Sequence, residues 1–141
     1  DRPDLVNRLV AISANAALES DPPALTDRSR EFLAALRSDD LEMPDGREAL
    51  PGAAEQWPAT AAQIVEMWRA GPTLSIGDLG RITAPVLYLA ADADIVPTEH
   101  TVAMQQATPG AQLAILPDAN HRLPQQRAAE VAAIVDRFLR P

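Results

Sequence analysis

Two short apolar runs of this sequence are each followed by a side chain that can take part in acid–base chemistry. Asp94 lies just beyond the run Val86–Ala90, and His121 lies just beyond Leu113–Leu116. If these runs are neighbouring parallel strands, their carboxyl ends meet at one edge of the sheet, about 5 Å apart. A carboxylate bonded to Nδ1–H of a histidine fixes the imidazole tautomer and stabilises the imidazolium. The pair therefore suits the acid–base half of a nucleophilic triad.

The same side chains also have purely structural interpretations, which stay open at this point. An Asp-x-Asp pattern after a strand is common in turns, and a single loop histidine is often solvated. We interpret Asp92 and Asp118 as turn or cap residues, and His100, inside a predicted helix, as a surface residue. The histidines and acids lack the spacing of H-E-x-x-H or EF-hand motifs, so we predict no metal site and no cofactor.

Three apolar runs predict the strands that position these residues. Leu9–Ile12 is short and β-branched, which is typical of a strand buried on both faces. Val86–Ala90 is the strongest strand signal, and Leu113–Leu116 is the third. The alternation of strand and helix after residue 82 favours a parallel sheet with right-handed crossovers. The expected fold class is α/β, with a partial parallel sheet of about three strands.

Helices are expected to flank this sheet. Thr98 can cap a helix that ends near Pro109–Gly110. A last helix has Pro124 near its start, and its apolar residues recur at helical spacing: Val131, Ile134, Val135 and Phe138. Ser75 and Asp78 have the spacing of a capping box, which predicts a short helical turn up to Gly80 or Arg81.

A long segment between the first strand and the second predicts a helical cap insertion. It contains an expected helix at 24–37, an exposed loop at 38–52 and a second helix at 59–70. We divide the chain into a first core strand (1–18), a cap (19–72) and the remaining core (73–141). Three apolar side chains could line a substrate pocket beneath the cap, or else pack in the core: Trp57, Met67 and Trp68.

Composition narrows the possible partners. The 141 residues are 47% hydrophobic and 23% charged, with a formal net charge of −8 and no cysteine. These values indicate a globular domain without disulfides or thiolate sites. We expect no nucleic-acid partner, because no basic stripe could follow a phosphate backbone. The sequence shows no membrane span and no leader, so we expect no membrane partner and a cytoplasmic location.

The segments around Asp94 and His121 resemble the C-terminal part of the α/β-hydrolase fold. Residues 82–97, Ile-Thr-Ala-Pro-Val-Leu-Tyr-Leu-Ala-Ala-Asp-Ala-Asp-Ile-Val-Pro, resemble that family's acid strand and loop, and 109–121 resemble its final strand and histidine loop. The resemblance covers nearly the whole chain and is strongest from Asp78 onward. It implies that Asp94 is the catalytic acid, His121 the catalytic histidine and Asp92 a companion of the acid.

The chain departs from this family in one respect. The family's nucleophile lies in G-x-S-x-G before the acid, and no such motif occurs here. Ser75 precedes Gly77, but Thr73 stands where the first glycine belongs, so Ser75 is better interpreted as a helix cap. The oxyanion segment is missing too. We therefore expect the nucleophile, Ser or Asp, to belong to an N-terminal half of the fold, and this chain to be inactive alone.

The resemblance implies hydrolysis of a carboxylic ester or a related acyl compound. Two alternatives stay open: a non-catalytic module that binds a small molecule, and a non-hydrolytic member of the fold, such as a haloperoxidase-like enzyme or a lyase. The expected partners are a small ester-like substrate and either the missing half or a second copy paired along an open sheet edge.

Overall fold

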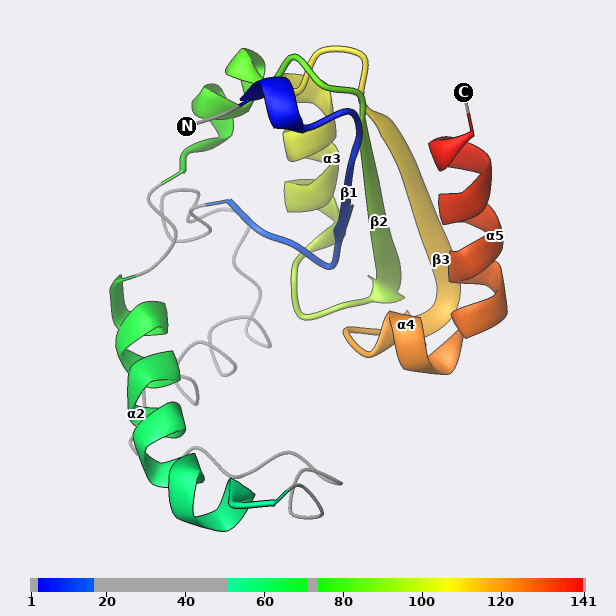
Figure 1. Ribbon diagram of the computed structural model, residues 1–141. Helices are drawn as coiled ribbons and strands as arrows, with labels where there is room; N and C mark the ends of the chain where they lie inside the picture. The colour runs from blue at the N-terminus through cyan, green and yellow to red at the C-terminus, as the bar shows by residue number, and fades with distance from the viewer. Residues whose placement is uncertain (1–2, 17–50, 71–73, 141) are drawn as a thin grey trace.

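The structure is a computed structural model that describes residues 3–16, 51–70 and 74–140 (Figure 1). The elements begin with a 3₁₀ turn, η1 (Pro3–Leu5), and end with the helix α5 (Ala128–Leu139). Between them lie β1 (Leu9–Ile12), α2 (Ala53–Ala70), η5 (Ile76–Arg81), β2 (Val86–Ala93), α3 (Thr98–Ala107), β3 (Gln112–Asn120) and α4 (Leu123–Gln126). No helix among the described residues is long and apolar enough to cross a bilayer.

The three strands form one parallel sheet in the order β1-β2-β3. Leu9 lies opposite Val86, and Leu87 lies opposite Gln112, so the three carboxyl ends share one edge. This confirms the predicted three-stranded parallel sheet. β2 is the central strand and its first six residues are buried. β1 was expected to be buried on both faces, but its residues are exposed or half-buried because it is an end strand of the described sheet.

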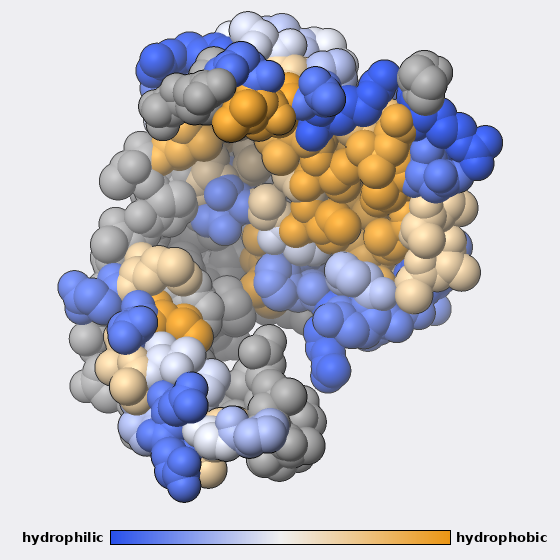
Figure 2. Space-filling view, viewed as in Figure 1, coloured by the Kyte–Doolittle hydropathy of each residue, from blue (hydrophilic) through white to orange (hydrophobic). Residues whose placement is uncertain are grey.

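Helices cover both faces of the sheet, and each face has its own apolar cluster. On one face, Leu89 and Leu116 pack with Leu123 of α4 and Val131 of α5. On the other face, Val86 and Tyr88 pack with Met104 of α3 and Leu79 of η5. The alternation of β2 side chains between the two clusters follows from the period of two in a strand. Figure 2 shows further apolar side chains in the region between β1 and α5.

Several predicted boundaries were wrong. β2 and β3 extend beyond the apolar runs, so that Asp92 and Asp118 lie inside strands. The N-cap of α3 is Pro97, without a side-chain cap bond, and Thr98 is the first helical residue. The last helix is two helices, α4 and α5, because the backbone leaves helical geometry at Arg127 (φ −127°, ψ 39°).

The helix α2 begins six residues earlier than the expected 59–70 and contains Pro58. Pro58 is the sixth residue of the helix, so its missing N–H removes one backbone hydrogen bond, and the helix nevertheless continues on both sides of it. Ala61 and Val65 are buried, as their spacing indicates. The expected helix at 24–37 and almost all of the loop at 38–52 lie outside the described residues, and the division at 18/19 and 72/73 stays a prediction.

Candidate active site

Asp94 and His121 meet at the carboxyl edge of the sheet. Nδ1 of His121 lies 2.7 Å from Oδ1 of Asp94. The Asp94 side chain is 0% exposed, whereas that of His121 is 43% exposed. The parallel register brings the two loops together, although the residues are 27 positions apart in the chain. The contact that the strand ends predict is therefore present, and the imidazole faces solvent beyond a buried carboxylate.

The carboxylate of Asp94 is held in its ionised form. Burial alone raises the pKa of Asp94, but hydrogen bonds from His121, Ser13 and the backbone N–H of Val96 together lower it below its ordinary value. An ionised carboxylate only accepts, so Nδ1 of a neutral His121 must carry the proton in this contact. Nε2 then bears the lone pair, and it lies across the ring from Asp94.

A third strand contributes a residue that the sequence analysis did not single out. Ser13, directly after β1, donates its hydroxyl to Oδ2 of Asp94 at 2.5 Å. The rule of strand carboxyl ends, applied to Leu9–Ile12 as well, would have found it. Because Ser13 is bonded to the acid, it lies on the Nδ1 side of the imidazole. It is therefore not placed where Nε2 would deprotonate a nucleophile.

Asp92 holds the backbone of the irregular end of β3, which leads into the histidine loop. Its Oδ2 accepts from the N–H of Asp118 at 3.1 Å, and its Oδ1 accepts from the N–H of Ala119 at 3.3 Å. These two bonds lower the pKa of Asp92. Asp118 has a positive φ of 53°, a conformation that Asp adopts more readily than most residues. Asp92 thus lies within β2 and not in a turn, and its carboxylate binds the backbone of the neighbouring strand.

Side chains of the segment after the histidine brace the same loop from the other side. Gln126 accepts from the N–H of Asn120 through its Oε1 at 3.0 Å. Arg127 donates to the carbonyl of Pro117 at 3.2 Å, and Glu130 holds its guanidinium through two further bonds. The break between α4 and α5 puts Arg127 where it can reach Pro117. The loop that carries His121 is thus fixed at several points of its backbone.

The other residues predicted from sequence lie elsewhere. His100 was expected on the surface, but it is fully buried in α3, which corrects that interpretation. Ser75 is the N-cap of η5 in a capping box with Asp78, as predicted. Trp57 is half-buried and Met67 is 61% exposed, so Met67 is not a core residue. The side chain of Trp68 lies outside the described residues, and a pocket under the cap stays a prediction.

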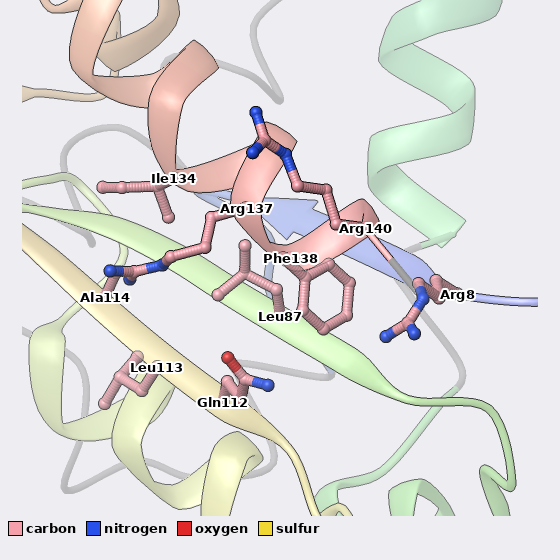
Figure 3. Close-up of a pocket in the computed structure, with 9 residues that line it drawn as sticks. All are labelled: Arg8, Leu87, Gln112, Leu113, Ala114, Ile134, Arg137, Phe138 and Arg140. Atoms are coloured by element: carbon pink, nitrogen blue, oxygen red, sulfur yellow. The ribbon is translucent and has the colours of Figure 1, made fainter.

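A cavity of about 310 Å³ lies at the amino ends of the strands, at the opposite edge of the sheet from the dyad of Asp94 and His121. Figure 3 shows its apolar centre and three arginines whose guanidinium groups point in different directions. Arg8 lies over the ring of Phe138, 5.5 Å from its centroid. The remaining lining residues come from β2, β3, α5 and the C-cap of α5: Leu87, Gln112, Leu113, Ala114, Ile134, Arg137 and Arg140. The divergent cations do not form a convergent site for an anion.

The described residues offer acid–base chemistry at the carboxyl edge. No cluster of three or more His, Asp or Glu side chains within them could hold a metal ion. A half-exposed imidazole with Nδ1–H bonded to a buried carboxylate is suited to accept a proton at Nε2 and return it.

Comparison with solved structures supports the same fold. The chain is similar to the putative non-heme bromoperoxidase BpoC from Mycobacterium tuberculosis, with 18% identity over 96% of this chain and 59% of that one (TM-score 0.61). It is similar to Est816, described as an N-acyl homoserine lactone degrading enzyme, with 18% identity, 99% and 60% coverage and a TM-score of 0.62. It is also similar to carboxylesterase CesB from Bacillus subtilis, with 20% identity over 97% of this chain and 52% of that one (TM-score 0.56). At these identities the likeness concerns the fold.

The chain spans between 52% and 60% of the length of these three structures. No curated protein matches the sequence. A family model described as the alpha/beta hydrolase family matches residues 2–134, which is nearly the whole chain. With the parallel sheet and the strand-end residues described above, this match shows that the chain belongs to the alpha/beta hydrolase family.

Proposed function

We propose that this chain supplies the acid and the base of a nucleophile–Asp–His triad that hydrolyses carboxylic esters or related acyl compounds. The observation that carries the proposal is the 2.7 Å contact between Nδ1 of His121 and Oδ1 of Asp94. The acid is buried and the base is partly exposed to solvent. A general base needs this combination, since its outer nitrogen must reach substrate while its inner nitrogen is held.

In the proposed reaction, Nε2 of His121 takes the proton of the nucleophile's hydroxyl as that oxygen bonds to the acyl carbon. Asp94 stays ionised, holds Nδ1–H and stabilises the imidazolium. The imidazolium then gives the proton to the leaving alcohol oxygen as the acyl C–O bond breaks. Water repeats the sequence and releases the carboxylic acid. An Asp nucleophile would belong to a different reaction: its carboxylate would displace a leaving group such as halide from an alkyl carbon, and water activated by His121 would then hydrolyse the resulting ester of the Asp.

The nucleophile is proposed to lie outside residues 1–141. The sequence contains no G-x-S-x-G, and the hydroxyl of Ser13 is bonded to the acid. Two of the similar structures are described as a carboxylesterase and as an N-acyl homoserine lactone degrading enzyme, which agrees with acyl chemistry. We therefore expect no ester hydrolysis by this chain alone, and hydrolysis by the full-length product of its reading frame.

The test is hydrolysis of a short-chain aryl ester by this chain and by the full-length protein. In the full-length protein, we expect His121→Ala and Asp94→Asn to lower kcat by roughly 10³- to 10⁴-fold, as loss of a triad member usually does. Asp136→Asn is the matched control, because Asp136 is an exposed aspartate of α5 and should keep full activity.

Two results would contradict the proposal. Hydrolysis by this chain alone, lost in His121→Ala, would show that the nucleophile lies within it. A folded full-length protein that hydrolyses no ester would exclude the proposed activity. In that case, peroxide-dependent bromination would identify the haloperoxidase-like alternative, and ligand binding without turnover would identify a binding module.

A further inference from the structure

Ser13 is held in an unusual backbone conformation at the end of β1. Its φ is +48°, in the left-handed region that side chains other than Gly, Asn and Asp seldom adopt. Its N–H still bonds to the carbonyl of Leu89 at 2.9 Å and so extends the parallel ladder by one residue. Such strain persists only where surrounding contacts impose it, and it is common at functional sites.

The oxygens of the Asp94 carboxylate have different donors. Oδ1 lies against Nδ1 of His121 and also accepts from the N–H of Val96 at 3.2 Å. Among the described residues, Oδ2 accepts from Ser13. Both donors on Oδ1 come from the second half of the chain, whereas Ser13 reaches the acid from 81 positions away. Oδ1 is therefore bound by groups that follow β2 and β3, and Oδ2 is bound by the residue that follows β1.

We propose that Ser13 is a positioning residue, whose hydroxyl holds Oδ2 of Asp94 and thereby keeps Oδ1 directed at Nδ1 of His121. A hydroxyl bonded to a carboxylate at this distance is a charge-assisted bond, stronger than one between neutral groups. It also favours the ionised acid, in agreement with the lowered pKa of Asp94. The role of the acid and histidine in catalysis rests on the proposed function; the role of Ser13 toward Asp94 does not.

The test uses Ser13→Ala and Ser13→Gly. Glycine removes the hydroxyl but suits the positive φ, so it remains informative if alanine disturbs folding. Ser75→Ala is the matched control, because it also removes a hydroxyl that is bonded to an aspartate, in η5. In this chain, carbon-13 NMR follows the titration of the Asp94 carboxyl, and nitrogen-15 NMR reports whether Nδ1 of neutral His121 carries the proton.

We expect both Ser13 variants to move the Asp94 titration to higher pH and to reduce the population with the proton on Nδ1. Ser75→Ala should leave both unchanged. In the full-length protein, we expect Ser13→Gly to lower kcat roughly ten- to a hundredfold, the worth of one hydrogen bond to a charged group, with little change in KM.

An unchanged Asp94 titration and an unchanged His121 tautomer in folded Ser13→Gly would overturn the proposal, as would a Ser75→Ala variant that shifts both equally. The NMR shifts do not depend on turnover. If they appear while the full-length protein hydrolyses no ester, the proposed function fails and the positioning role stands. If esters are hydrolysed and the shifts are missing, the positioning role fails alone.

Discussion

Asp94 connects the chemistry of the site to the stability of the molecule. Its side chain is fully buried, and its hydrogen bonds require the ionised form. Its pKa in the folded protein therefore lies below the ordinary value of 3.8 that an unfolded chain would show. As pH falls, Asp94 therefore becomes protonated in the unfolded chain before it does so in the folded protein. Its contribution to the free energy of unfolding is fully present above its pKa in the unfolded chain and is lost as pH falls through its pKa in the folded protein.

We expect the wild-type free energy of unfolding to decrease as pH falls below about 4. Asp94→Asn cannot titrate, so its stability should decrease less over the same range. Urea unfolding followed by circular dichroism, at a series of pH values from neutral to acid, measures both. Asp136→Asn removes an exposed carboxylate and serves as the control for the loss of a surface charge. If the free energy of unfolding falls equally with pH in Asp94→Asn and in the wild type, the Asp94 carboxylate does not contribute to the pH dependence of stability.

The dyad could be predicted from residue type and order, but its environment could not. Asp94 and His121 follow strong strand signals, and parallel strands share one carboxyl edge. Ser13 follows Leu9–Ile12, so the same rule places it at this edge, but the sequence does not show that its hydroxyl binds Asp94, 81 positions away. The burial of His100 depends on packing of α3 against the sheet, which polarity along the sequence does not reveal.

At the scale of elements, the histidine loop is held largely by the strand next to it. Asp92 and Asp94 lie two residues apart on β2, and one fixes the loop backbone while the other contacts the histidine side chain. The apolar runs predict β2 and β3 but end before either strand does, because the ladder continues through polar residues. The break at Arg127 was missed, since the apolar spacing begins only at Val131.

We expect Asp92→Ala to loosen the histidine loop without unfolding the sheet. Amide hydrogen exchange at Asp118 and Ala119 should accelerate roughly three- to tenfold, the usual effect of losing one hydrogen bond. Asp92→Asn keeps one acceptor oxygen and should give a smaller change. Exchange within β2 at Leu87 and Leu89 serves as the internal reference. Unchanged exchange at both amides in Asp92→Ala would show that the Asp92 carboxylate does not hold this backbone in place.

At the scale of the whole molecule, β1 is an end strand of the described sheet. The N–H of Leu9 bonds to the carbonyl of Pro85, directly before β2, and the N–H of Ser13 bonds to the carbonyl of Leu89 in β2. By strand alternation, the N–H of Ala11 points the same way, and that of Val10 points to the outer edge. Within the described residues no strand pairs with this outer edge, and an unpaired strand edge is a template for pairing with another chain. We propose that this chain, taken alone, pairs along β1 with a second copy.

Light scattering during size-exclusion chromatography should then show a dimer whose fraction rises with concentration. Val10→Pro removes an outward N–H and should weaken the dimer while β1 stays paired with β2. Ala11→Pro removes an inward N–H and should instead lower the free energy of unfolding. A chain that stays monomeric at all concentrations, or a dimer that Val10→Pro leaves intact, would contradict pairing along this edge.

The parallel register also sets an order of assembly. Leu87 pairs with Gln112 across a short stretch of chain, whereas Leu9 pairs with Val86 across a stretch about three times as long. Closing the longer loop costs about 1 kcal/mol more in chain entropy, so β2, α3 and β3 should come together before β1 docks. Asp94 and His121 belong to the early unit and Ser13 to the late strand. The acid and the histidine therefore meet first during folding, and their geometry becomes fixed only when the last strand arrives.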